Sequence, residues 1–217
     1  SLSVAALKDR GFEKIPSYGV EPIDVPGAVA GWMTLHERFG KLPLEEVMAP
    51  AIRYAEEGYP VTPNISRLWQ EAFENYSKYR DRPEFQGWFD TFAPNNTWLK
   101  PGEMFRCPDT AKTLKEIAAT KGEAFYRGAI AEKIDAFFKK HNGFLTKEDL
   151  AAFKPEWVDP ISVNYHGVDV WELPPNGHGI TVLMALQILK DMNLAERDCA
   201  DTMHKQIEAM KLAMVDT

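Results

Sequence analysis

Apolar residues recur at every third or fourth position over most of this 217-residue chain, which is the pattern of amphipathic helices. The spacing predicts a series of helices over residues 26–39, 44–57, 65–76, 109–121, 129–141, 146–153, 180–189 and 201–214. Asp109 and Asp201 are the expected caps of two of them, and Thr146 with Asp149 resembles a capping box. Pro50 is expected to kink or divide its helix, because proline removes one backbone hydrogen bond. Residues 1–24, rich in turn-forming Gly and Pro, are expected to form no stable element.

One stretch has the two-residue period of a β-hairpin instead. Ile161, Val163 and Tyr165 alternate with polar residues, a tight turn follows, and residues 168–173 return as a second strand. Because an isolated two-stranded hairpin is marginal in water, it must pack on helices or join strands supplied from elsewhere. The predicted fold class is therefore mainly α with one β-hairpin.

The loop after the second strand is the first candidate site. Two prolines end the strand, and the loop then continues as Asn176, Gly177, His178 and Gly179. Next comes helix 180–189, in which eight of ten residues are apolar, so it is expected to be central to a packed body. A glycine loop at a helix N-terminus offers free N–H groups to an anion. From the residues alone, a plain structural loop is the favoured interpretation.

Aromatic residues make the connection 81–108 a second candidate region. It contains four prolines and the rings of Phe85, Trp88, Phe89, Phe92 and Trp98. A connection of this length is either functional or mobile. The rings fit two interpretations equally well: they line a groove or partner interface, or they anchor the segment to the helical body.

Composition limits the remaining functions. The net charge of −7 argues against nucleic-acid binding, and the longest apolar run is about half a membrane span, so we expect a soluble protein with no membrane span and no leader peptide. Cys107 and Cys199 have no paired spacing that predicts a disulfide or a zinc site. The histidines lack metal-binding spacing, so no metal and no cofactor are predicted, and His36 is interpreted as a hydrogen-bonded packing residue.

Several blocks, in order along nearly the whole chain, together resemble the gamma-glutamyltransferase (gamma-glutamyltranspeptidase) family. They include residues 25–31 (VPGAVAG), 39–43 (FGKLP), 122–128 (GEAFYRG), 143–146 (GFLT) and 173–177 (LPPNG). The resemblance implies an N-terminal-nucleophile (Ntn) hydrolase with an αββα sandwich, made as a precursor that cuts itself into two subunits. A threonine of the small subunit would then attack a gamma-glutamyl amide, with its own α-amine as base.

The resemblance also assigns parts to this chain. It implies an internal segment of the large subunit, with residues 1–160 as its helical lobe and residues 161–217 joining the sandwich core. The expected partners are the small subunit with its nucleophilic threonine and a small gamma-glutamyl substrate, with no nucleic acid. Residues 176–179 are the expected substrate-binding loop near the active-site cleft.

Two departures from the family pattern restrict which family properties the resemblance implies for this chain. The loop has Asn-Gly-His-Gly where the family usually has Ser-Ser-Gly-Gly, which favours an acylase-like branch. The chain also has neither the Thr-Thr pair of the nucleophile nor an Arg-Glu-x-Ala-Pro motif, so no catalytic residue is assigned and the segment alone is expected to be inactive. The alternatives are an acylase acting on non-glutamyl amides and a non-catalytic helical domain that binds partners through residues 85–98.

Overall fold

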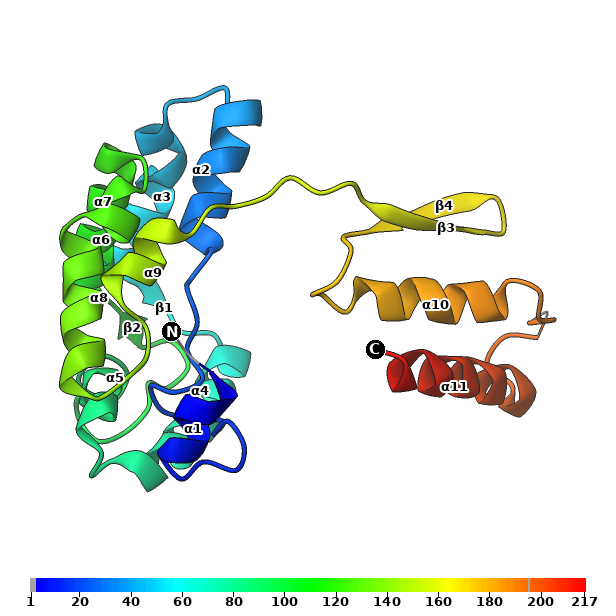
Figure 1. The fold of residues 1–217 in the computed structure, drawn as a ribbon, viewed down its shortest axis with the longest axis horizontal. Coiled ribbons are helices and arrows are strands. Elements are labelled where there is room, and N and C mark those ends of the chain that lie inside the picture. Colours follow the sequence, from blue (N-terminus) through cyan, green and yellow to red (C-terminus); the bar gives the residue numbers. More distant parts are fainter. Residues whose placement is uncertain (1–2, 195) are drawn as a thin grey trace. The chain divides into compact units, whose positions relative to one another are not determined.

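The computed structural model describes residues 3–194 and 196–217, which divide into two compact units (Figure 1). The first unit ends at Pro155, and the second runs from Glu156 to Thr217. The elements of the first unit are α1 (Val4–Asp9), α2 (Ala28–Phe39), α3 (Leu44–Glu57), β1 (Tyr59–Pro60), α4 (Pro63–Tyr76), η1 (Ser77–Tyr79), η2 (Pro83–Phe85), α5 (Gln86–Phe92), β2 (Met104–Phe105), α6 (Pro108–Thr120), α7 (Glu123–Arg127), α8 (Ala129–Lys140) and α9 (Lys147–Ala152). The second unit contains β3 (Ile161–Tyr165), β4 (Val168–Glu172), α10 (Gly179–Leu189) and α11 (Ala200–Val215).

The mainly helical fold class is confirmed, and so are most of the predicted helices. The helix α3 runs through Pro50 as one continuous element instead of two abutting helices. The predicted capping box is present: the Thr146 hydroxyl accepts from the Asp149 N–H, and the Asp149 carboxylate accepts from the Thr146 N–H at 3.0 Å. Among the described residues, no helix is both long and apolar enough to cross a bilayer.

Three α-helices and two strands were not predicted. The helix α1 forms where no stable element was expected, because Ser3 accepts a hydrogen bond from the Ala6 N–H and caps it. The short helices α5 and α7 lie in stretches that the apolar period did not mark. Strands β1 and β2 pair antiparallel, with Tyr59 opposite Phe105, and add a second strand pair to the hairpin.

The predicted caps Asp109 and Asp201 are both wrong by two residues, because the N-cap residues are Cys107 and Cys199. The helix α6 begins at Pro108, because proline at the first helical position has no N–H to leave unsatisfied. The helix α11 begins after Cys199, whose sulfur accepts from the Thr202 N–H. Each aspartate instead lies in the first turn, where the helix dipole favours negative charge.

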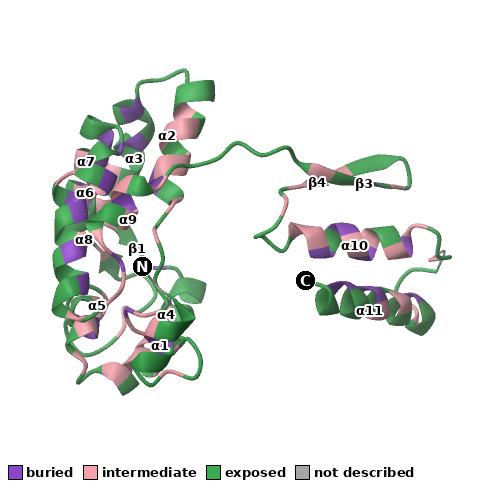
Figure 2. Ribbon diagram, viewed as in Figure 1, coloured by how far each residue is buried: buried purple, intermediate pink, exposed green. Residues whose placement is uncertain are grey.

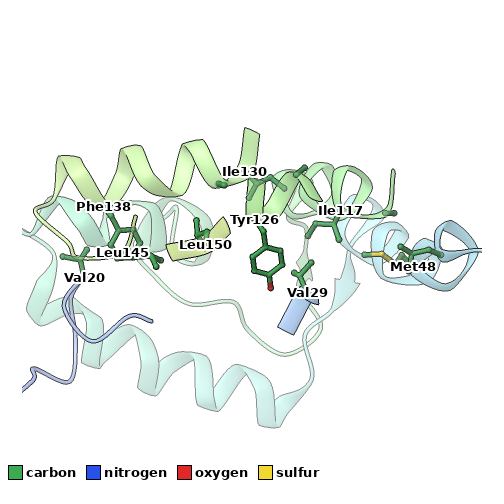
Figure 3. Packing of buried hydrophobic residues seen from close by; sticks show 13 residues of the cluster. Val20, Val29, Met48, Ile117, Tyr126, Ile130, Phe138, Leu145 and Leu150 are labelled. Carbon is green, nitrogen blue, oxygen red and sulfur yellow. The ribbon is translucent and has the colours of Figure 1, made fainter. Parts of the chain in front are cut away.

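The core of the first unit is formed where α3 packs against α6 and where α7 packs against α8 and α9 (Figure 3). Tyr126 of α7 is buried in this core beside Val29. Its hydroxyl donates to the Pro26 carbonyl at 2.7 Å and accepts from the Ala30 N–H at 3.0 Å. Gly27, the N-cap of α2, has no side chain with which to cap the helix. Tyr126 therefore supplies the polar contact that the start of α2 needs.

The second unit packs α10 between the β3–β4 hairpin and α11. The hairpin has the predicted pairing, with Val163 opposite Val170, and its turn at His166 and Gly167 uses positive φ angles of 49° and 85°. The buried residues of α11 are small, namely Thr202, Ala209 and Ala213 (Figure 2). The larger residues of the predicted apolar stripe of α11 are exposed in this unit; they are Met203, Ile207, Met210 and Met214.

Asp135 ties α8 to the first turn of α9. Its carboxylate accepts from Lys139 Nζ at 2.6 Å and from the backbone N–H of Lys147 at 3.1 Å. The Lys139 hydrogen bond, with a smaller contribution from Lys147, holds the pKa of Asp135 below its usual value although burial acts in the opposite direction. The ionised carboxylate therefore stabilises the folded state, and this contribution is lost as the pH falls through the lowered pKa.

We expect Asp135→Asn to lower Tm at pH 7 and to lessen the loss of stability between about pH 5 and pH 2. Thermal melts over this pH range are the measurement. Asp109→Asn is the matched control, since Asp109 also pairs with a lysine, Lys112, but its side chain is 87% exposed against 9% for Asp135. Because water screens the exposed pair, its Tm drop should be several times smaller. Equal drops would contradict this role of Asp135.

Candidate functional site

The candidate loop joins the end of β4 at Glu172 to the start of α10 at Gly179. His178 is the N-cap residue, and its carbonyl accepts the Thr181 N–H at 3.0 Å. The predicted change from strand to buried helix at this point is confirmed. The α10 N–H groups at Gly179 and Ile180 precede the first intrahelical bonds and point out of the helix end.

The candidate residues lie at the surface of the second unit. Asn176, Gly177 and His178 are exposed, and Gly179 is half-buried. The structure thus brings one amide side chain, one imidazole and the N-terminal end of a helix together within four consecutive residues. These groups can donate hydrogen bonds to a polar ligand and orient it.

Glu172 is a further residue of this site that the sequence did not single out. A Cβ placed on Gly179 would lie 2.5 Å from Glu172 Oε2 and 2.8 Å from Glu172 Cβ, so the two residues are in close contact. The Glu172 carboxylate therefore lies against the first residue of α10, where the helix dipole favours negative charge. An anionic ligand at the same helix end would meet a like charge, so the site suits a neutral polar group better than a second carboxylate.

The first turn of α10 is also held from the side of α11. Thr181 is buried, and its hydroxyl donates to Thr217 Oγ1 at 2.9 Å, which in turn donates to the Ala213 carbonyl at 3.1 Å. The start of α10 is thus held on one side by the contact of Gly179 with Glu172 and on the other side by the hydrogen bond of Thr181 with Thr217. Within the described residues, no cluster of His, Cys, Asp and Glu could hold a metal ion.

Part of the aromatic segment anchors it to the helical unit and part of it lines a cavity, while a partner interface stays a prediction. Phe85 and Phe89 are buried and anchor it to the helical unit. Trp88 and Phe92 also line an apolar cavity of about 280 Å³. The other lining residues come from α4 and the β1–β2 pair, and they are Tyr59, Ile65, Leu68, Trp69, Ala72 and Phe105. His36 has the expected hydrogen bond, with its Nε2 2.8 Å from the Leu42 carbonyl oxygen, and it is half-buried.

Comparison with known proteins extends over the whole chain. The sequence profile of the family described as gamma-glutamyltranspeptidase matches residues 2–217. A solved cephalosporin acylase from Bacillus halodurans has 52% sequence identity and a TM-score of 0.96, with 100% of this chain and 40% of that chain covered. A gamma-glutamyltranspeptidase structure from Helicobacter pylori has 29% identity and a TM-score of 0.83, covering 94% of this chain and 58% of that one.

A relative of known function also matches nearly the whole chain but only part of its own length. The glutathione hydrolase proenzyme of Pseudomonas aeruginosa is 32% identical over 217 residues, which cover 97% of this chain and 37% of the relative. The chain therefore spans well under two thirds of the length of the proteins it matches.

The contact between Gly179 and Glu172 gives a test in which two effects have opposite signs. By helix propensity alone, Gly179→Ala would stabilise α10 by up to about 1 kcal/mol. We expect it instead to destabilise the chain by about 1–3 kcal/mol, because Glu172 Cβ is fixed to the backbone and cannot rotate away. Denaturant unfolding is the measurement.

Gly177→Ala is the matched control for this variant. A Cβ on Gly177 would meet no atom within 4 Å, so its stability should change by less than about 0.5 kcal/mol. If Gly179→Ala were as stable as Gly177→Ala, Glu172 would not be packed against the helix end.

Proposed function

The chain belongs to the gamma-glutamyltranspeptidase family, and from this premise we propose that it forms an internal part of the large subunit of an amide-cleaving Ntn hydrolase. Residues 1–160 form the helical lobe of that subunit, and residues 161–217 join the sandwich core. The nucleophilic threonine belongs to the small subunit, made from the same precursor. The name "proenzyme" of the Pseudomonas aeruginosa relative supports such processing.

In the proposed reaction, the threonine hydroxyl attacks the carbonyl carbon of an amide while its own α-amine accepts the hydroxyl proton. The amine of the substrate leaves with that proton, and an acyl-enzyme ester remains. Water or an acceptor amine then attacks the ester and releases the acyl group. Residues of the 176–179 loop contact the substrate, with Glu172 holding the loop in place through its contact with Gly179.

One observation supports the choice of substrate class: the 217 residues are 52% identical to the matching part of a cephalosporin acylase. The altered Asn-Gly-His-Gly loop agrees with it, because the family usually has two serines there. We therefore propose an acylase that acts on non-glutamyl amides. Gamma-glutamyl hydrolysis or transfer is the second candidate, and it is favoured by the 32% identical glutathione hydrolase relative. A non-enzymatic binding domain loses support, because the family is one of enzymes.

The complete reading frame that contains this segment tests the proposal. We expect the purified protein to separate into two chains on a denaturing gel and to hydrolyse an N-acylated cephalosporin with a kcat/KM at least about tenfold above that for a gamma-glutamyl anilide, a difference of ~1.4 kcal/mol in transition-state binding. The reverse ratio would favour the second candidate. The 217-residue segment alone is expected to turn over neither substrate, and measurable turnover by it would contradict the assignment of the nucleophile to the other subunit.

His178→Ala in the complete protein tests the loop. Loss of one oriented hydrogen-bond donor near the substrate should lower kcat/KM about tenfold or more while leaving precursor cleavage intact. His166→Ala is the control, because His166 lies in the β3–β4 turn at the other end of strand β4. If His178→Ala had the same kcat/KM as the parent enzyme, the loop would not contact substrate.

A further inference from the structure

Two Asn-Gly pairs occur in the chain, and the fold gives them different surroundings. One is Asn142-Gly143, just after α8, and the other is Asn176-Gly177 in the candidate loop. Asn142 and Asn176 are both exposed, so solvent reaches both side chains. Any difference in their chemistry must therefore come from how the fold holds the two backbones.

An asparagine that precedes glycine can lose its side-chain amide without an enzyme. The glycine backbone nitrogen gives up its proton to water and attacks the side-chain carbonyl carbon of the asparagine. The bond from this carbon to the side-chain nitrogen breaks, ammonia leaves, and a five-membered succinimide ring remains. Water then opens the ring at either carbonyl, which gives aspartate or isoaspartate. Glycine favours the attack, because it has no Cβ to hinder the approach of the two groups.

The backbone at Asn142-Gly143 is held in place. The Gly143 N–H donates to the Phe138 carbonyl at 2.8 Å, as part of the cap that ends α8. Asn142 has a positive φ of 56°, and its carbonyl accepts a hydrogen bond from the Arg10 guanidinium. A Cβ on Gly143 would lie 2.3 Å from the Phe138 ring, so this backbone is packed directly against the ring. The nitrogen that must attack is thus already hydrogen-bonded, and its peptide unit has no room to rotate.

The backbone at Asn176-Gly177 lacks these restraints. Within residues 3–194 and 196–217, no hydrogen bond joins the Gly177 N–H or the Asn176 side chain to another group. A Cβ on Gly177 would meet no atom within 4 Å, so open space surrounds this peptide unit. The Gly177 nitrogen can therefore approach the Asn176 side chain without breaking a contact of the fold.

We propose that Asn176 is a site of spontaneous deamidation, whereas the fold protects Asn142. The product has a new carboxylate in the candidate loop, four residues after Glu172, whose own carboxylate lies against the first residue of α10. An isoaspartate also adds one methylene group to the main chain between β4 and α10. Deamidation thus changes both the charge of the loop and the length of its backbone. It needs neither a substrate nor a second subunit, so it is independent of the proposed function.

Mass spectrometry of the full 217-residue chain after incubation in mildly alkaline buffer tests the proposal. Trypsin places Asn142 in the peptide 141–147 and Asn176 in the peptide 148–190, and fragment ions locate the one-dalton gain of each conversion on its residue. We expect Asn176 to convert at least about tenfold faster than Asn142, because Asn142 reacts only after its hydrogen-bonded cap opens locally. Similar rates at the two sites in the folded chain would overturn the proposal.

The same chain unfolded in urea is the reference. Both asparagines precede glycine, so without the fold they should convert at nearly the same rate. In the folded chain, the rate at Asn142 should fall well below this reference, and the rate at Asn176 should stay close to it. A rate at Asn176 that fell as far as the rate at Asn142 would show that the fold protects both sites, and the proposal would be wrong.

Gly177→Ala tests whether the conversion passes through the succinimide. The added methyl group crowds the attacking nitrogen and should slow conversion of Asn176 about tenfold. The variant should melt as the parent chain does, because the new Cβ meets no atom of the fold. Asn176→Gln should remove the reaction at this position, since glutamine would have to close a slower six-membered ring. If Gly177→Ala converted as fast as the parent chain, the assigned reaction would be refuted.

Discussion

Helix α10 is apolar on every side, and the second unit is arranged by the need to cover it. The β3–β4 hairpin packs on one side and α11 on another, with small residues of α11 at the contact. Even so, Val182 of α10 remains 41% exposed, and the larger residues of α11 face away from the helix they pack on. The second unit therefore has more apolar surface than its own elements bury, which agrees with a chain that spans about 40% of its solved acylase relative.

The sequence predicted those elements whose signals are local. Glycine and proline at the helix ends, the alternation of 161–165 and the capping box of Thr146 and Asp149 each depend on residues close together in the chain, and the structure contains all of them. The missed elements depend on contacts made at a distance. The strands β1 and β2 are two residues each and exist because Tyr59 lies opposite Phe105, a pairing that no short-range pattern encodes.

Only the part of the candidate site that depends on local sequence signals was predicted. Two prolines and two glycines mark the loop 173–179 in the sequence, and it forms where they predict. The contribution of Glu172 was missed, because its importance comes from the distance between its side chain and Gly179 across a turn. The cavity beside the aromatic segment was foreseen from one side only, because Trp88 and Phe92 lie in the segment 81–108, whereas Tyr59 and Trp69 come from an earlier part of the chain.

The Tyr126 hydroxyl closes the first turn of α2 from 96 residues further along the chain. The first turn of α2 is complete only when the chain between Ala30 and Tyr126 has closed into a loop. Closing this loop lowers the entropy of the chain before the two hydrogen bonds can form. We therefore expect the first turn of α2 to be largely unformed in the folding transition state. Its hydrogen bonds would then slow unfolding of the first unit and leave the rate of folding almost unchanged.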